Sequence, residues 1–114
     1  MTQGYTEIQK YLDLSKEQLY TIKFKTNDNF LLRQVADESC LIPIGEATDF
    51  DQSIISLNET AAYLWKLFSN GSTIQSAINQ TLCDYDESKE IIEYSVVNFV
   101  FENVRLKFLH EEEM

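Results

Sequence analysis

The feature that most constrains the fold is a long segment that predicts one helix, apolar around more than half of its circumference. It runs from about residue 87 to residue 107, and Asp86 precedes it as a candidate N-cap. At about 100° per residue, one side carries Ile92, Val96, Phe99 and Leu106. The opposite side carries Tyr94, Val97, Phe101 and Val104. A helix on a single core needs an apolar arc of only about 100°. We therefore expect this helix either to be sandwiched between other elements or to offer one flank to a groove or a dimer partner.

The segments before this helix predict short strands and then two more helices. Strand-like runs occupy residues 30–35, 40–44 and 53–57, and residues 22–25 alternate with period two. Amphipathic stripes behind the N-caps Asn58 and Thr73 predict helices over residues 58–70 and 73–84. This order predicts an α+β fold, in which a three-stranded antiparallel sheet is followed by three helices. The expected core residues, which share helical spacing, are Leu64, Trp65, Phe68, Ile78, Val96 and Phe99.

The chain of 114 residues has the length of one domain. Residues 1–20 are expected to form an N-terminal extension that is helical or partly disordered, and the sequence from Ser15 to Gln18 fits a capping box. Residues 21–110 are expected to form the folded domain. The acidic residues 111–114 are expected to form a solvated tail.

The composition excludes several classes of function. Nine Lys and Arg against nineteen Asp and Glu give a net charge of −10, which disfavours binding to nucleic acid and to anionic membranes. Cys40, Cys83 and His110 are too few and too scattered for a metal site, so we expect no metal and no organic cofactor. Glycine-rich nucleotide motifs and nucleophile motifs are absent, so we do not expect an enzyme. Because no apolar run is long enough for a membrane span and the chain does not open like a signal peptide, we expect a cytoplasmic protein.

An ordered series of segments carries a resemblance to a known family. The segments are Phe30-Leu31-Leu32-Arg33, Cys40-Leu41-Ile42-Pro43-Ile44-Gly45, Ile55-Ser56-Leu57-Asn58-Glu59-Thr60-Ala61-Ala62-Tyr63-Leu64-Trp65, Gly71-Ser72-Thr73-Ile74 and Asp84-Tyr85-Asp86. The most specific part is the run from Ser56 to Thr60, followed five residues later by Trp65. Over about residues 22–109 the chain resembles the PqqD family, named for pyrroloquinoline quinone biosynthesis protein D.

The resemblance implies a winged-helix-like domain that recognises peptides during ribosomal peptide modification. Such domains bind the leader of a precursor peptide and present it to a modifying enzyme, often a radical S-adenosylmethionine enzyme. The leader adds as a strand to the edge of the third strand and packs against the third helix. The matching strand positions in this chain are Ser53, Ile54, Ile55 and Ser56. On the helix, we select from its geometry Tyr94, Val97, Asn98 and Phe101.

Two departures from the family pattern bear on this interpretation. The flank that carries Tyr94, Val97 and Phe101 is more apolar than is usual in the family, which favours either a homodimer contact or coverage by the N-terminal extension. Asn103 stands where the family usually has an apolar core residue, so the register of the helix near its end is open. The family's domains serve many peptide products, among them the quinone cofactor.

Two alternatives belong to other functional classes. A structural dimerisation domain would also use a broadly apolar helix. A winged-helix transcription regulator would share the three helices and the β-wing. The second alternative is disfavoured because residues 84–93 carry five acidic side chains and the single base Lys89, where a DNA-recognition surface needs Lys and Arg.

Overall fold

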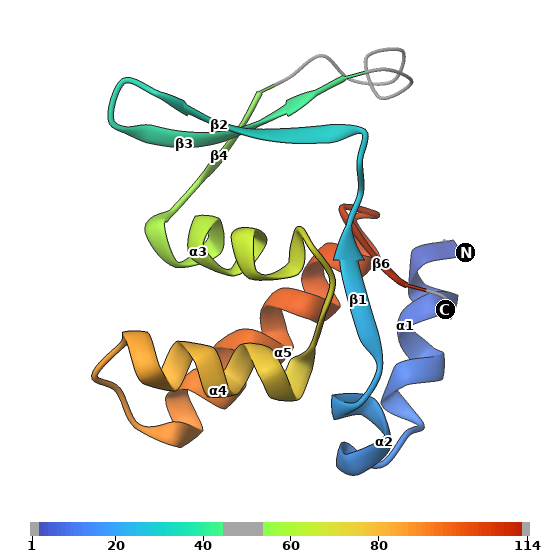
Figure 1. Cartoon of the computed structure of the whole chain (residues 1–114). Helices are drawn as coiled ribbons and strands as arrows, with labels where there is room; N and C mark the ends of the chain where they lie inside the picture. Colours follow the sequence, from blue (N-terminus) through green and yellow to red (C-terminus); the bar gives the residue numbers. More distant parts are fainter. Residues whose placement is uncertain (1–2, 45–53, 113–114) are drawn as a thin grey trace.

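The computed structural model describes residues 3–44 and 54–112, with side chains described from residue 8 onward. The elements in chain order are α1 (Gln3–Leu12), α2 (Lys16–Tyr20), β1 (Lys23–Thr26), β2 (Phe30–Val35), β3 (Glu38–Pro43), β4 (Ile55–Leu57), α3 (Glu59–Phe68), β5 (Ser72–Thr73), α4 (Ile74–Asp84), α5 (Lys89–Arg105) and β6 (Leu109–Glu111). In Figure 1, β2, β3 and β4 form a layer of their own above α3, and α4 and α5 lie below it. We call the layer of β2, β3 and β4 the wing.

The wing and the helices that follow it confirm the predicted α+β fold. The strand order is β2-β3-β4 and both pairings are antiparallel. Val35 pairs with Glu38, so Ala36 and Asp37 form a two-residue turn. Ala36 has a φ of +56°, and a positive φ at the first central position of such a turn matches the twist of the flanking strands. Pro43 ends β3, as expected of a residue that cannot donate a backbone hydrogen bond.

The helices begin at residues that cap them. Asn58 accepts a hydrogen bond from the backbone N–H of Ala61 at 2.8 Å, and Thr73 accepts one from Ser76 at 3.0 Å. Both caps were predicted from the sequence. The predicted start of the last helix was wrong, because Ser88 rather than Asp86 caps it and α5 begins at Lys89.

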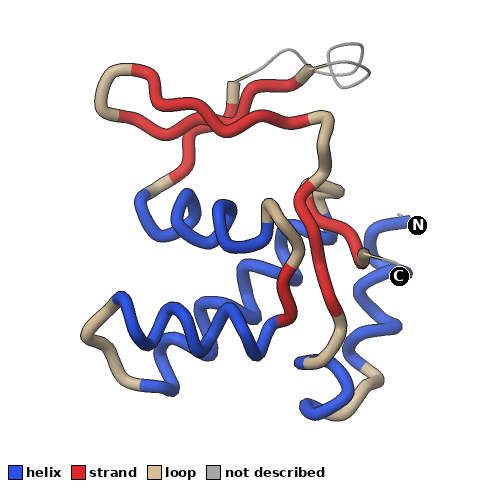
Figure 2. The backbone as a smooth tube through the Cα atoms, viewed as in Figure 1, coloured by secondary structure: helices blue, strands red, loops and turns tan. Residues whose placement is uncertain are grey.

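A second antiparallel sheet, with the order β5-β1-β6, was not predicted as a sheet. Its three strands have only two to four residues each and come from distant parts of the chain (Figure 2). The alternation over residues 22–25 marks β1, but nothing in so short a pattern names its partners. The predicted solvated tail also differs from the structure, because Glu111 lies in β6 and the N–H of Glu112 donates to the C=O of Lys23 at 2.7 Å.

The N-terminal helices complete the core. Within the part of residues 1–20 that the structure describes, the chain forms α1 and α2, and the predicted capping box of Ser15 and Gln18 is present. Tyr11, Leu19 and Tyr20 are buried, and α1 packs along α5. The ring of Tyr11 lies edge-on to that of Phe24 at 5.4 Å, which joins α1 to the second sheet.

The predicted core is confirmed, since Leu64, Trp65, Phe68, Ile78, Val96 and Phe99 are all buried. The residues of α5 that face this core are Ile92, Val96, Phe99, Val100 and Val104. Two side assignments on the helix were wrong, because Val104 is buried whereas Leu106 is 44% exposed. Leu106 is the C-cap of α5, at the end of the helix and beyond its buried residues.

Replacement of Trp65 by Ala is expected to destabilise the fold strongly. Trp65 is 3% exposed, and loss of a buried aromatic side chain costs about 3–5 kcal/mol. Urea denaturation of the two proteins measures the difference. Ile91→Ala is the matched control, because Ile91 is 53% exposed and its truncation should change stability by only about 0.5 kcal/mol. Equal, small effects of both substitutions would remove Trp65 from the core.

Candidate functional site

The outer strand of the wing, β4, has one open edge. It pairs antiparallel with β3, with Ile55 opposite Leu41 and Leu57 opposite Ser39. Within residues 3–44 and 54–112, no strand pairs along its other edge. The prediction that the third strand is an edge strand is therefore confirmed for Ile55–Leu57. A strand at the edge of a sheet presents a row of free N–H and C=O groups.

The hydrogen bonds of the β2–β3 hairpin determine which residues of β3 face β4. The N–H of Ile44 donates to the C=O of Asn29 at 2.8 Å, across the open end of the hairpin. In an antiparallel ladder, hydrogen-bonded and non-hydrogen-bonded pairs alternate. Ile42 and Cys40 therefore direct their backbone groups toward β2, whereas the residues that flank each of them in β3 direct theirs toward β4. The position of Pro43 agrees with this pattern, because its missing N–H would point away from β2.

The same alternation identifies the free groups of β4. Ile55 and Leu57 stand opposite the residues of β3 that face them, so their N–H and C=O groups bond within the wing. Ser56 lies between them and turns its N–H and C=O to the open edge. Ile54 lies two residues before Ser56 and so has the same orientation, and its side chain is 59% exposed. Ser56 therefore offers the backbone donor and acceptor to which an added strand would bind.

A hollow of about 360 Å³ begins where this edge ends, between the first turns of α3 and the middle of α5. Its lining residues are Asn58, Thr60, Ala61, Leu64, Tyr94, Ser95, Asn98, Phe99, Glu102 and Asn103. Leu64 and Phe99 are buried and supply apolar surface, whereas Tyr94 is 72% exposed. We call this hollow, together with the open edge of β4, the β4–α5 groove.

The three elements that build the groove lie in a part of the chain that matches a known protein family. The family model described as coenzyme PQQ synthesis protein D (PqqD) matches residues 42–109, which is more than half of the chain. The chain belongs to the PqqD family. The match includes β4, α3 and α5, the three elements that build the groove, and members of the family are non-catalytic peptide-binding proteins.

A solved structure shares this PqqD-type fold. It is TbiB1 in complex with the TbiA(β) leader peptide, with a TM-score of 0.61 and 14% sequence identity. The similarity covers 79% of this chain and 99% of TbiB1. A search of curated proteins found no significant match.

The predicted strand residues of the site lie along β4 or just before it. Ile54 is exposed, Ile55 is half-buried against the core, and Ser56 is exposed. Ser53 lies outside the described residues. The sequence could not decide whether Ile55 or Ser56 turns its N–H to the open edge, because this depends on how β4 pairs with β3.

The predicted helix residues divide into two pairs. Tyr94 and Asn98 line the groove. Val97 and Phe101 do not line it and are half-buried against the core. Val97 follows Glu93 by four residues on the same stripe of α5, and that stripe faces the N-terminal helices.

Contacts of Glu93 hold α2 against this flank of α5. The hydroxyl of Tyr20 donates to Glu93 at 2.7 Å, and the ammonium of Lys16 lies 2.7 Å from the same carboxylate. The hydrogen bond from Lys16, followed by that from Tyr20, lowers the pKa of Glu93. Burial, followed by the hydrogen bond to Glu93, raises the pKa of Tyr20. The carboxylate is thus stabilised in its charged form. The N-terminal extension contacts the flank at Glu93, whereas Tyr94, which was expected on the same flank, stays exposed.

Several lining residues were not predicted as site residues. Asn58 was assigned only as a helix cap, although it also lines the groove. Thr60 ends the most specific family segment and Ala61 directly follows it, and this segment was the available signal. Asn103 donates its side-chain N–H to the C=O of Phe99 at 2.8 Å, so the helix satisfies this polar residue itself and its register is unchanged.

The groove offers apolar surface and hydrogen-bonding groups with little charge. Glu102 is the one carboxylate in its lining, and it forms an ion pair with Arg105. Among the described residues, no three His, Cys, Asp or Glu side chains gather as a metal ion would require. In the same part of the chain, no helix has the length and apolar character needed to cross a membrane.

Proposed function

We propose that this chain captures the leader of a ribosomally made precursor peptide by strand addition to β4 and presents it to a modifying enzyme. The chain itself catalyses no reaction in this scheme. A radical S-adenosylmethionine enzyme is the expected partner, and the complex forms in the cytoplasm. The observation that carries the proposal is the open edge of β4 beside the groove between α3 and α5.

Strand addition needs free backbone groups in line with a surface that can hold side chains. Ser56 supplies the donor and the acceptor, by the alternation along β4. Successive side chains of an added strand point to opposite faces of the sheet. Every second side chain of the ligand would therefore point into the groove, over Leu64 and Phe99, while the others lie on the face of Ile54. The solved complex of TbiB1 with a leader peptide supports leader binding by this chain, because TbiB1 shares the fold.

The lining of the groove indicates which ligand side chains suit it. The exposed ring of Tyr94 and the buried Leu64 and Phe99 suit an apolar anchor. Asn98 and Thr60 at the rim can hydrogen-bond to the ligand backbone or to a polar side chain. Because the only carboxylate of the lining is already paired, affinity should depend more on apolar contacts than on salt concentration.

A homodimer is the second candidate, because the open edge of β4 could pair with the same edge of a second copy. Both candidates use the same backbone groups, so a leader peptide would compete with dimerisation. Size-exclusion chromatography with and without the leader peptide separates the candidates. A monomer that binds the peptide supports capture, whereas a dimer that the peptide leaves intact supports the structural role.

Replacement of Ser56 by Pro is expected to weaken leader binding about tenfold or more. Proline removes the outward N–H, and one hydrogen bond contributes about 0.5–1.5 kcal/mol, to which the clash of the ring with the added strand is added. Because that N–H points away from β3, the wing should still fold. Ser56→Ala, which keeps the N–H, is the matched control, and calorimetric titration with the leader encoded beside the gene gives the affinities. Equal affinities of the Pro variant and the parent would show that the ligand does not add to this edge.

Replacement of Tyr94 by Ala is expected to weaken leader binding by about 1–3 kcal/mol without lowering stability, since Tyr94 is exposed in the groove. Phe101→Ala should instead lower the free energy of unfolding, because Phe101 is half-buried against the core. Titration and urea denaturation of both variants separate the two effects. The opposite result would place the ligand on the other flank of α5. In that case Phe101→Ala would lose affinity without losing stability, and Tyr94→Ala would bind as the parent does.

A further inference from the structure

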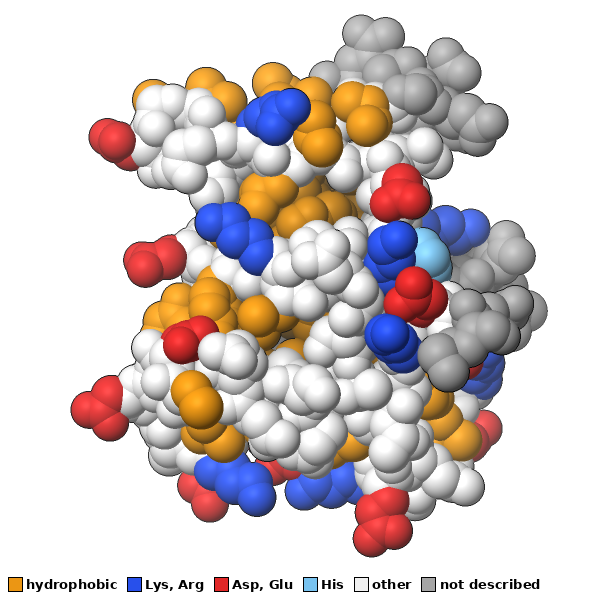
Figure 3. Space-filling view, in the orientation of Figure 1, with side chains coloured by type: hydrophobic (Ala, Val, Ile, Leu, Met, Phe, Trp, Pro, Cys, Tyr) orange, Lys and Arg blue, Asp and Glu red, His pale blue; other side chains and the backbone are white. Residues whose placement is uncertain are grey.

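A second and larger hollow lies on the other flank of α3 from the groove, between that helix and the tip of the β2–β3 hairpin. Its volume is about 590 Å³. Its lining includes Gln34, Asp37 and Glu38 of the hairpin, Glu59, Tyr63 and Lys66 of α3, and Tyr85 after α4. Figure 3 shows a recess between the wing and the helical layer, with apolar side chains inside and both acidic and basic side chains on its rims. We call it the hairpin hollow.

Two tyrosines give the hairpin hollow a fixed aromatic wall. The rings of Tyr63 and Tyr85 meet edge to face, with centroids 5.0 Å apart. The hydroxyl of Tyr63 donates to the carboxylate of Asp84 at 2.5 Å, which holds the ring in place. Burial, followed by this hydrogen bond, raises the pKa of Tyr63 to about 12.

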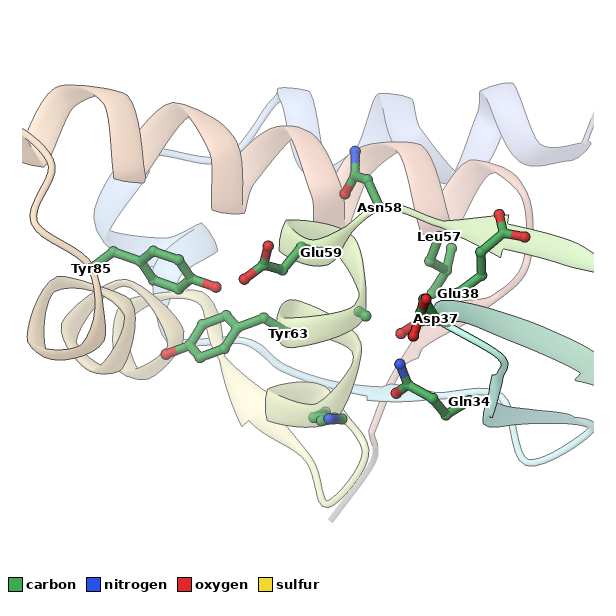
Figure 4. A pocket seen from close by; sticks show the side chains of 11 residues that line it. Gln34, Asp37, Glu38, Leu57, Asn58, Glu59, Tyr63 and Tyr85 are labelled. Atoms are coloured by element: carbon green, nitrogen blue, oxygen red, sulfur yellow. The ribbon is translucent and has the colours of Figure 1, made fainter.

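Three acidic residues line the hairpin hollow. Figure 4 shows Glu59 extending from α3 toward the two tyrosines, while Asp37 and Glu38 lie on the hairpin at the other end of the hollow. None of the three forms a hydrogen bond through its side chain or an ion pair with another described residue. Lys66 is the one cation of the lining, so three negative charges stand against one positive charge. The hollow therefore combines uncompensated negative charge with an aromatic surface.

This combination suits the side chain of arginine. A guanidinium group is planar, stacks on aromatic rings and pairs with carboxylates through several N–H groups. We infer that the hairpin hollow docks a basic segment of the modifying enzyme, with an arginine stacked on Tyr63 or Tyr85 and paired with Glu59. This inference rests on the proposed function, because it assigns the surface by which the captured peptide reaches the enzyme.

Two other occupants fit the structure less well. A second copy of this chain carries a net charge of −10 and would bring like charges together. The precursor peptide would lie along β4 and α5, on the opposite flank of α3. The two hollows share only Asn58, so a peptide and an enzyme can occupy them at the same time.

The test uses the full chain and a probe peptide, acetyl-Gly-Arg-Gly-Arg-Gly-amide, in an NMR titration at low salt. We expect shifts of the amide signals of Tyr63, Tyr85 and Glu59. A matching peptide with citrulline in place of arginine, which keeps the shape and loses the charge, should bind at least fivefold more weakly. Shifts spread evenly over the acidic surface, or equal affinity for both peptides, would overturn the inference.

A pair of charge-matched variants tests the residues. The triple substitution Asp37→Asn, Glu38→Gln and Glu59→Gln should weaken binding of the arginine peptide at least fivefold. The control, Asp86→Asn, Glu87→Gln and Glu90→Gln, changes the net charge equally at exposed residues outside the hollow and should change affinity less than twofold. Equal losses of affinity in both variants would show that only the net charge of the protein matters, and this would overturn the inference.

Two further measurements separate this inference from the proposed function. The triple variant of Asp37, Glu38 and Glu59 should bind the leader peptide as tightly as the parent does. It should bind the modifying enzyme encoded beside the gene at least fivefold more weakly. Displacement of the arginine peptide by the full precursor would make the hairpin hollow part of the peptide site and overturn enzyme docking. Failure of the leader to bind at β4, with the arginine results intact, would contradict the proposed function alone.

Discussion

Burial of α5 between α3, α4 and the N-terminal helices is the constraint on which the other elements depend. Five residues of this helix are buried in the shared core, from Ile92 to Val104. The remaining apolar surface of α5 is used in two ways. On one flank, Tyr20 and Lys16 of α2 form a hydrogen bond and an ion pair with Glu93, and Val97 is half-buried. The other flank stays open beside α3 and becomes a wall of the groove.

The wing adds a second constraint, which comes from the backbone rather than from side chains. Because hydrogen bonds alternate along antiparallel strands, the pairing of Ile44 with Asn29 determines the direction of every backbone group as far as β4. Ser56 thereby faces outward at the same place where the groove begins. The site thus depends on the register of a hairpin whose turn lies at Ala36 and Asp37, just before the part of β3 that pairs with β4.

Much of the fold could be predicted from the sequence because the signals were local. Asn58 and Thr73 mark helix starts by their own side chains, and the buried stripe through Trp65 has regular helical spacing. The sheet of β5, β1 and β6 could not be predicted, because strands this short carry no information about partners some 50 to 90 residues away. The residues of the candidate groove were also predicted only in part, because they depend on packing between distant segments. Helical angles brought out Tyr94 and Asn98, but only the packing of the N-terminal helices separates them from Val97 and Phe101.

Hydrogen–deuterium exchange of the amides of β4, measured by NMR with and without the leader peptide, tests the central claim most directly. The N–H groups of Ile55 and Leu57 bond within the wing, so they should be protected in both states. The N–H of Ser56 faces the open edge and should exchange rapidly in the free protein and slowly in the complex. A complex in which the leader is bound and Ser56 still exchanges as in the free protein would contradict strand addition at β4.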